Sequence, residues 1–274
     1  MNEQTLTQKE TTRKPVITIA TVTYNAVDTL PCTLQSVAEQ DYSRIEHVII
    51  DGRSRDHTLG VIQQYVEQNT VALTPHNIRL VCEPDNGLYD AMNKAIAQAT
   101  GEYIVFLNAG DRLHDKHTIS HIVECADWIK GDYANPAILY GETDLVDLQG
   151  TFIRHRRLKV PKTLTWKSFQ NGMLVCHQSF YVRTDLAREV RYDLRYRFSA
   201  DFDWCIRVMK RAQKRRLKLV NTEAILTDYL SEGMTTQNHK KSLVERLHIM
   251  VEHYGWPTTL ACHAWFVIRG IIKR

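Results

Sequence analysis

Short apolar runs alternate with segments of helical periodicity through residues 16–107. Four of the runs are rich in β-branched and aliphatic residues, which is typical of strands. These predicted strands lie at 16–22, 46–50, 78–82 and 103–107. Between them, apolar residues recur every three or four positions, which predicts helices at about 28–40, 57–68 and 88–99. The β-α-β-α-β-α-β order predicts a parallel sheet joined by right-handed crossovers.

Capping residues and turn residues set the expected ends of these helices. Asp28 is expected to cap the first helix, with Pro31 tolerated in its first turn, and Asp56 to cap the second. The turn sequence 84–87 (PDNG) leads into the third helix. Gly101, a residue free to adopt positive φ, is expected to stop that helix.

After Lys130 the strict alternation ends. Strands are expected at 137–146 and 151–158, about the hairpin turn Gln149–Gly150. Two more strands are expected at 178–183 and 217–226, and a helix at 199–210 with Ile206 and Met209 facing inward. A last helical stripe consists of Leu243, Leu247, Met250, Val251 and Tyr254.

Residues 256–274 form an aromatic-rich apolar segment that also carries Arg269, Lys273 and Arg274. The segment is too short and too polar to span a bilayer. Two alternatives stay open for it. It is a terminal helix packed on the body of the protein, or an interfacial helix lying on an anionic membrane.

Composition describes an ordinary soluble globular chain of 274 residues, with 43% hydrophobic and 24% charged residues. The net charge of +4 is small and the basic residues are mixed with 31 acids, so a nucleic-acid partner is not expected. Six cysteines are scattered without a CxxC pair, which predicts reduced cytosolic thiols. Residues 1–14 are polar and are expected to be a disordered leader, not a signal peptide. The expected location is the cytoplasm, or a membrane surface on that side.

Polar residues follow three of the four predicted parallel strands. They are Tyr24 and Asn25, Asp51, and the segment from Asn108 to Asp111. Because ligands bind beyond the carboxyl ends of the strands in an open α/β sheet, these side chains are expected to share one crevice. A mononucleotide needs such a set, namely an aromatic for the base and acids for N–H groups, hydroxyls and a metal. The alternative is that Asp51 and Asp56 are turn and cap residues only. No GxGxxG or GxxxxGK[ST] motif supports a Rossmann site or a P-loop.

Asp111 follows a buried strand on a Gly-containing turn, which suits it to hold a divalent cation and, through it, a phosphate. The alternative is that Asp111 only caps the next helix.

Six motifs in a fixed order, covering about residues 15–250, resemble those of inverting family 2 glycosyltransferases with the GT-A fold. The motifs are TVTYN (21–25), IIDGRSRDHT (49–58), EPDNGLYDAMNKAI (83–96), GEYIVFLNAGD (101–111), CHQSFYVR (176–183) and RYDLRYRFSADFDWCIRV (191–208). SEGMTTQN (231–238) resembles the loop after the last core strand. The combination of NGLYDAMNK with FLNAGD is most similar to bacterial exopolysaccharide enzymes of the colanic-acid type.

The resemblance implies an α/β protein with a mainly parallel sheet, helices on both faces and a small antiparallel acceptor-side subsheet. The implied divisions are a GT-A domain at 15–235, with a nucleotide-sugar half at 15–130 and an acceptor half at 131–235, and a C-terminal helical extension at 236–274. The implied reaction moves one sugar, with inversion, from a nucleotide-diphosphate sugar to a hydroxyl of a lipid-linked saccharide. The oligomeric state is left open.

The resemblance also implies site residues. Asp201, in the SADFD segment, matches the catalytic carboxylate and would act as general base, with a plain helix N-cap as the alternative. Donor contacts are implied for Tyr24, Asp51, Asp90, Asn93 and Asn108. Acceptor contacts are implied for His177, Gln178 and Asp203. The implied metal is Mg²⁺ or Mn²⁺, held by Asp111.

The chain departs from the family pattern in three places. Asn108-Ala109-Gly110-Asp111 replaces the usual Asp-x-Asp-Asp, and Asp51-Gly52 replaces a DDG sequence. The QxxRW signature of processive synthases is missing, which favours one sugar per encounter. Two rival functions remain: a nucleotidyltransferase, and a nucleotide-sugar-binding GT-A-like protein that has lost catalysis.

Overall fold

The computed structural model describes residues 14–125, 135–231 and 239–272. The strands are β1 (Ile17–Thr23), β2 (Ile45–Asp51), β3 (Asn77–Cys82), β4 (Tyr103–Phe106), β5 (Arg112–Leu113), β6 (Ile138–Val146), β7 (Phe152–His155), β8 (Phe180–Arg183) and β9 (Leu219–Leu230). The helices are α1 (Leu30–Ala38), α2 (Thr58–Thr70), α3 (Leu88–Gln98), α4 (Thr118–Glu124), α5 (Thr184–Glu189), α6 (Ala200–Lys214), α8 (His239–Tyr254) and α9 (Trp256–Ile272). Two 3₁₀ turns are η1 (Trp166–Asn171) and η2 (His177–Ser179).

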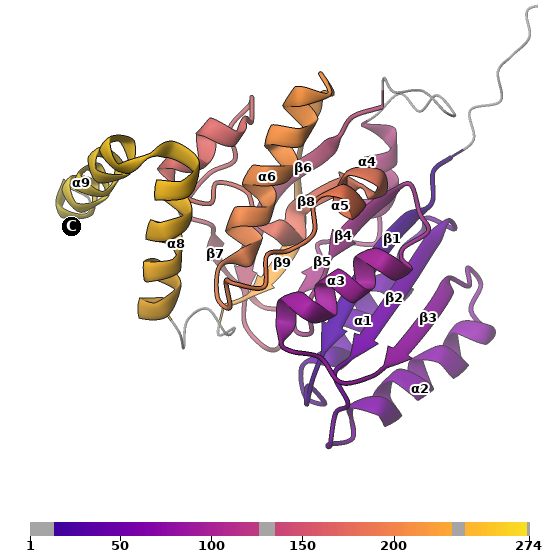
Figure 1. Ribbon diagram of the computed structural model, residues 1–274. Helices are drawn as coiled ribbons and strands as arrows, with labels where there is room; N and C mark the ends of the chain where they lie inside the picture. Colours follow the sequence, from indigo (N-terminus) through magenta and orange to yellow (C-terminus); the bar gives the residue numbers. More distant parts are fainter. Residues whose placement is uncertain (1–13, 126–134, 232–238, 273–274) are drawn as a thin grey trace, which may run out of the picture.

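One continuous sheet runs through both halves of the chain, in the order β3-β2-β1-β4-β8-β6-β9-β5, with β7 paired to β6 (Figure 1). The strands β3, β2, β1 and β4 are parallel, as predicted. β8 then runs antiparallel to β4, and β6 antiparallel to β8. The sheet therefore joins the two predicted halves at the β4–β8 pair.

Side chains of the parallel strands alternate between two buried layers. In β1, Ala20 and Val22 pack with α3 residues on one face, whereas Ile17 and Ile19 belong to the cluster under α4 on the other. Helices on both faces explain why these strands are apolar at every position. The predicted α/β architecture is confirmed.

Several element boundaries differ from the sequence-based expectations. Helix α1 begins at Leu30 with Thr29 at the N-cap, and Asp28 is exposed, so Asp28 is not its cap. The N-cap of α2 is His57 and not Asp56, but Asp56 accepts hydrogen bonds from the backbone N–H and the hydroxyl of Thr58 and so stabilises the first turn of α2.

Gly101 is required for a different reason than the one expected. Helix α3 already ends at Gln98, and Gly101 does not have a positive φ. A Cβ at this position would lie 2.6 Å from Thr18 Oγ1 and 2.7 Å from the carbonyl oxygen of Val16. The glycine therefore permits close approach of the chain to β1.

The later elements keep their predicted order with shifted limits. β8 begins at Phe180 because residues 177–179 form the turn η2, and α6 extends to Lys214. Ile206 and Met209 are buried, as predicted. Of the apolar stripe predicted in α8, Met250 is buried and Tyr254 packs against the core, whereas Leu243 is 48% exposed and Ile249, outside the predicted stripe, is buried.

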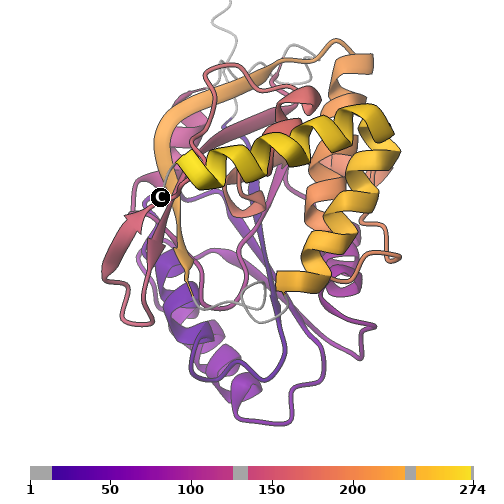
Figure 2. The ribbon, with the colours of Figure 1, turned by 90° about the vertical axis from the view of Figure 1, so that its left-hand side faces the viewer.

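The C-terminal pair α8–α9 lies on the side of the molecule that carries α6, away from α2 (Figure 1). Figure 2 shows α9, in yellow, running crosswise to α8. In the described part of the chain, no helix combines the length and apolarity needed to cross a bilayer. Residues 1–13 of the expected leader, 232–238 of the SEGMTTQN segment, Lys273 and Arg274 lie outside the described residues, as does the side chain of Arg269.

Candidate active site

The carboxyl ends of β1, β2 and β4 meet at one edge of the sheet. Thr23 at the end of β1 pairs with Asp51 at the end of β2, and Ala20 pairs with Phe106 at the end of β4. This register brings Tyr24, Asp51 and the segment 108–111 to the same edge, as the sequence predicts.

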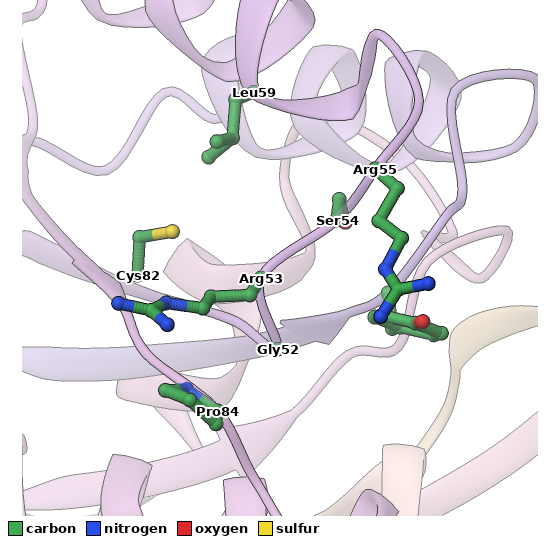
Figure 3. Close-up of a pocket in the computed structure, with 8 residues that line it drawn as sticks. Gly52, Arg53, Ser54, Arg55, Leu59, Cys82 and Pro84 are labelled. Carbon is green, nitrogen blue, oxygen red and sulfur yellow. The ribbon is translucent and has the colours of Figure 1, made fainter.

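A pocket of about 650 Å³ opens beside the ends of β1 and β2. It is lined by Tyr24, Gly52, Arg53, Ser54, Arg55, Leu59, Cys82 and Pro84. Tyr24 is 55% exposed, so its ring is available to a ligand. Figure 3 shows the guanidinium of Arg53 between Cys82 and Pro84, and that of Arg55 on the other side of Gly52.

Asp51 is closed off from this pocket. It is fully buried, and its carboxylate accepts hydrogen bonds from the Ser54 backbone N–H at 2.9 Å and the Ser54 hydroxyl at 2.5 Å. The Cys82 thiol donates to the same group at 3.4 Å. The contacts of Asp51 are those of a turn residue, which is the alternative interpretation of its place in the sequence.

Thr33 of α1 fixes the turn that follows β4. Its hydroxyl donates to the Asp111 carbonyl oxygen at 2.7 Å and accepts from the Gly110 N–H at 2.9 Å. Gly110 has a φ of 103°, a conformation that favours glycine. A side chain there would also meet Leu230 Cδ2 at 2.7 Å. The departure from Asp-x-Asp-Asp at Gly110 is therefore built into the backbone of the turn.

Asp111 is a buried carboxylate at the base of the site. It is 4% exposed, and it accepts hydrogen bonds from Gln178 Nε2 at 2.9 Å and from the Leu230 backbone N–H at 3.1 Å. Burial raises the pKa of Asp111 to about 6, although both hydrogen bonds oppose that rise. Burial therefore disfavours the ionised form of Asp111, and a nearby cation would stabilise that form.

Asp201 lies in the first turn of α6 and has two partners. Tyr89 donates its hydroxyl proton to Oδ1 at 3.0 Å, and His177 Nδ1 lies 3.3 Å from Oδ2. Burial alone would raise the pKa of Asp201, but the hydrogen bond and charge of His177, together with Arg246, lower it below its usual value. The side chain is 13% exposed, so an ionised carboxylate remains within reach of a ligand.

Two adjacent residues of η2 connect the two acids. Gln178 bonds Asp111, and His177 pairs with Asp201 while its Nε2 lies 3.3 Å from Asn108 Nδ2. One short turn therefore holds the carboxylates at 111 and 201 in the same part of the molecule. The pair 177–178 contacts these acids, whereas the sequence indicated contacts with an acceptor.

Two residues of α3 support the site from behind. Asp90 accepts a hydrogen bond from the Asn86 backbone N–H at 2.9 Å and so fixes the loop before the helix. The Asn93 amide pairs with the backbone of Tyr192, accepting at 2.8 Å and donating at 3.0 Å. Because both ends of the amide are engaged, Asn93 supports the donor side instead of lining it.

Asp203 neither faces solvent nor is open to an acceptor. It is 2% exposed, and its oxygens bind Arg207 Nε at 2.6 Å and His253 Nε2 at 2.8 Å. The acceptor contact expected of Asp203 is replaced by an anchor between α6 and α8. Glu245 of α8 also accepts the backbone N–H groups of residues 197 and 198, which lead into α6.

The residues present fit a divalent cation that draws most of its ligands from a bound substrate. Within the described ranges, no three His, Cys, Asp or Glu side chains converge as a metal cluster. Asp111 offers a carboxylate with one hydrogen bond on each oxygen, and the buried Oδ1 of Asn108 has no partner. Oxygen ligands of this kind suit Mg²⁺ or Mn²⁺, which keep waters and take phosphate oxygens.

Sequence reasoning did not identify the contact of Tyr89 with Asp201, nor a carboxylate at Asp85 beside the pocket. Tyr89 lies outside the predicted apolar stripe of its helix, two positions after the PDNG turn, and that was the available signal. Asp85 lies within that turn and was interpreted as a turn residue only.

The chain matches a family model described as Glycosyl transferase family 2 over residues 18–191. A PGL/p-HBAD biosynthesis glycosyltransferase of Mycobacterium bovis is 32% identical over 194 residues, covering 70% of this chain and 69% of the relative. The amylovoran biosynthesis glycosyltransferase AmsB of Erwinia amylovora is 26% identical over 227 residues, covering 81% and 72%.

Two solved structures have the same fold. S. aureus TarS 1-349 in complex with UDP-GlcNAc superposes with a TM-score of 0.64 at 18% identity, covering 86% of this chain and 66% of that chain. The mannosyltransferase PcManGT of Pyrobaculum calidifontis, in complex with GDP-Man and Mn²⁺, superposes with a TM-score of 0.62 at 18% identity, covering 94% and 76%. The predicted GT-A fold is confirmed.

Proposed function

Because this chain belongs to glycosyl transferase family 2 and is a glycosyltransferase, we propose that it moves one sugar from a nucleotide-diphosphate sugar to a saccharide hydroxyl with inversion. One observation carries the proposal. The buried carboxylate of Asp111 and the partly exposed carboxylate of Asp201 have opposite pKa shifts, and adjacent residues of η2 hold both at the sheet edge that carries the pocket of Tyr24.

Asp201 is the general base in this reaction. Its carboxylate takes the proton of the acceptor hydroxyl while the oxygen attacks the anomeric carbon. The bond from that carbon to the diphosphate oxygen breaks, and the nucleoside diphosphate leaves with the electron pair. The lowered pKa keeps Asp201 ionised at neutral pH, and Tyr89 and His177 fix its position.

Asp111, with the Asn108 amide oxygen, would hold Mg²⁺ or Mn²⁺ on the leaving-group side. The cation would neutralise the charge that develops on the diphosphate. The Mn²⁺ that accompanies GDP-Man in the PcManGT complex supports this assignment, as does the raised pKa of Asp111. Gln178 and the Leu230 backbone N–H orient the carboxylate.

The proposed acceptor is a lipid-linked saccharide in the synthesis of an exopolysaccharide or another cell-surface glycan. Relatives named for PGL/p-HBAD and amylovoran biosynthesis support this class of product. The proposed location is the cytoplasm, at the inner face of the plasma membrane.

Helix α9 is the proposed membrane contact. Cys262 and Phe266 pack against the protein core, and apolar side chains on other positions are about half exposed. These exposed side chains are Trp256, Leu260, Trp265 and Ile268. At about 100° per residue these side chains spread over about half of the helix circumference, opposite the half that carries Cys262 and Phe266. Trp is favoured at membrane interfaces.

Co-sedimentation with vesicles of phosphatidylglycerol and phosphatidylcholine tests the membrane contact. The full chain is expected to sediment with these vesicles, and the double variant Leu260→Ser/Trp265→Ser to remain in solution. The control is the full chain with vesicles of phosphatidylcholine alone, which carry no anionic lipid. Equal sedimentation of both proteins would refute the contact.

Release of nucleotide from UDP- or GDP-sugars without acceptor tests the proposed reaction. With Mn²⁺ the protein is expected to release UDP or GDP slowly, and EDTA or Asp111→Ala to stop the release. Tight donor binding without any release or transfer would favour the inactive binding protein. Release of pyrophosphate from UTP or GTP supplied with a sugar 1-phosphate, in a parallel reaction, would favour the nucleotidyltransferase.

A further inference from the structure

In the pocket lined by Tyr24, the end of β2 offers no side-chain oxygen that is free to accept a hydrogen bond from a ligand. Asp51 is fully buried and bonded to Ser54 and Cys82, and the next residue is Gly52, which has no side chain. The base of a nucleotide in this pocket would therefore find no free carboxylate on β2.

Asp85 places a carboxylate at the position that Gly52 leaves open. Its Oδ2 lies 2.4 Å from the point where a Cβ on Gly52 would stand, and Tyr24 Cδ2 lies 3.4 Å from the same point. Oδ1 accepts a hydrogen bond from the Gly87 N–H at 2.9 Å. Oδ2 has no hydrogen-bond donor among residues 14–125, 135–231 and 239–272.

The two residues before Asp85 are held by hydrogen bonds and an ion pair. The Glu83 backbone N–H bonds the Asp51 carbonyl oxygen at 3.0 Å. Lys94 Nζ binds the Glu83 carboxylate at 3.0 Å and the Pro84 carbonyl oxygen at 2.5 Å. The half-buried Asp85 is thus held beside the pocket before any ligand arrives.

We propose that Asp85 selects the nucleobase of the sugar donor, by accepting a hydrogen bond from the ring N–H of uracil or guanine. The proposal rests on the proposed function. Both bases present a ring N–H next to a carbonyl oxygen, and the exposed Arg53 and Arg55 of the pocket supply donors for such oxygens. Cytosine and adenine present a ring nitrogen lone pair at the same edge, which a carboxylate repels.

Arg53 adds a separate sign that this loop is shaped for a ligand. It has a φ of 62°, in the left-handed region that Arg rarely adopts. Such backbone strain in a pocket wall is typical of binding loops.

Titration calorimetry with nucleoside diphosphates and Mn²⁺ tests the role of Asp85. UDP against CDP, and GDP against ADP, are matched pairs that differ at the base edge. Wild type is expected to prefer UDP or GDP over its partner by about tenfold or more, because a hydrogen bond to a charged group is lost and a repulsion gained. Asp85→Asn keeps the acceptor for Gly87 and replaces Oδ2 by an NH₂ group. Its preference is expected to vanish or reverse.

Two further variants make the result decisive. Gly52→Ala forces a methyl group onto Asp85 Oδ2 and is expected to lose the same preference. Glu67→Gln, an exposed change on α2, is expected to behave as wild type. If Asp85→Asn keeps the preference, or wild type binds CDP or ADP as tightly as UDP or GDP, the assignment of Asp85 is wrong while the proposed function stands. If wild type binds none of the four, both are wrong.

Discussion

The end of β4 and the start of α6 each carry one acid that is largely shielded from solvent, but the pKa values of the two acids are shifted in opposite directions. Asp201 meets a histidine and a tyrosine hydroxyl, and its pKa is lowered. Asp111 accepts hydrogen bonds from neutral donors, Gln178 and a backbone N–H, and the charge of His177 acts on it more weakly than these bonds, so burial raises its pKa to about 6. Burial is common to both, so the partners decide the charge state. In the proposed reaction, the base therefore has its polar partners within the protein, whereas Asp111 would gain a charged partner from a bound cation.

Replacing the base should have the largest effect on activity. Asp201→Asn is expected to slow sugar transfer by about 10²- to 10⁴-fold, the usual worth of a general base. Binding of the donor should remain close to that of wild type, because Tyr24 and the pocket lie at the ends of β1 and β2. Initial rates and donor titrations on the same preparation separate the two effects. A variant with half of the wild-type rate would show that another group takes the proton.

Replacing Asp111 should change how the free energy of unfolding depends on pH. A folded pKa of about 6 against 3.8 means that the favourable contribution of protonated Asp111 is present below pH 3.8 and is lost as pH rises through about 6. The loss amounts to about 3 kcal/mol at most, at about 1.4 kcal/mol per pH unit. Urea unfolding of wild type in EDTA should show it between pH 4 and 6.

Asp111→Asn cannot ionise, so its unfolding free energy should fall less than that of wild type over the same interval. Asp28→Asn, an exposed change, provides the matched control and should follow wild type. Parallel curves for wild type and Asp111→Asn would mean that the carboxylate at 111 is not disfavoured by burial.

Replacing His177 should bring the pKa of Asp201 closer to that of Asp111. His177 is the main group that lowers the pKa of Asp201 against burial, so His177→Leu should raise that pKa. The acid limb of the kcat/KM profile should then move to higher pH. His177→Asn, which retains a hydrogen-bond donor without the charge, should shift it less. An unchanged limb in both variants would assign His177 to the acceptor alone.

Tyr89→Phe should have the smallest effect of this series. The variant loses one hydrogen bond to Asp201 but keeps the ring that stacks on Tyr192. A decrease in turnover of about tenfold to thirtyfold is expected, which corresponds to the lower end for a hydrogen bond to a charged group, about 1.5–2 kcal/mol. Tyr65→Phe, which loses a buried hydroxyl bond to His47 in another cluster, should leave turnover unchanged. A loss as large as that of Asp201→Asn would make Tyr89 part of the proton transfer.

The parallel half of the fold could be predicted because local pattern and global burial agree there. Strands covered on both faces must be apolar throughout, and residues 16–22 and 103–107 show this directly. In α8 the prediction was wrong for Leu243 but not for Met250, because tertiary contacts orient the helix. Ser242 faces inward to bond Ser199, which leaves Leu243 exposed.

Positions of the site residues were predictable, whereas their partners were not. Strand ends indicated Asp51 and Asp111, and a helix start indicated Asp201. The contact between Tyr89 and Asp201 joins residues 112 positions apart, and the Leu230 donor to Asp111 is a backbone group without a side-chain signal. Asp51 and Asp203 show the converse, since suitable acids proved to be fully occupied by structural partners.

The contacts that α8 makes with the start of α6 set an order of events during synthesis. Glu245 binds the backbone just ahead of Asp201, and His253 binds Asp203 in the same turn of the helix. While the ribosome still shields these α8 residues, the turn carrying the base has no partner for its leading N–H groups. A nascent chain can therefore fold its first strands early, whereas the turn that carries Asp201 gains these partners only when α8 has emerged.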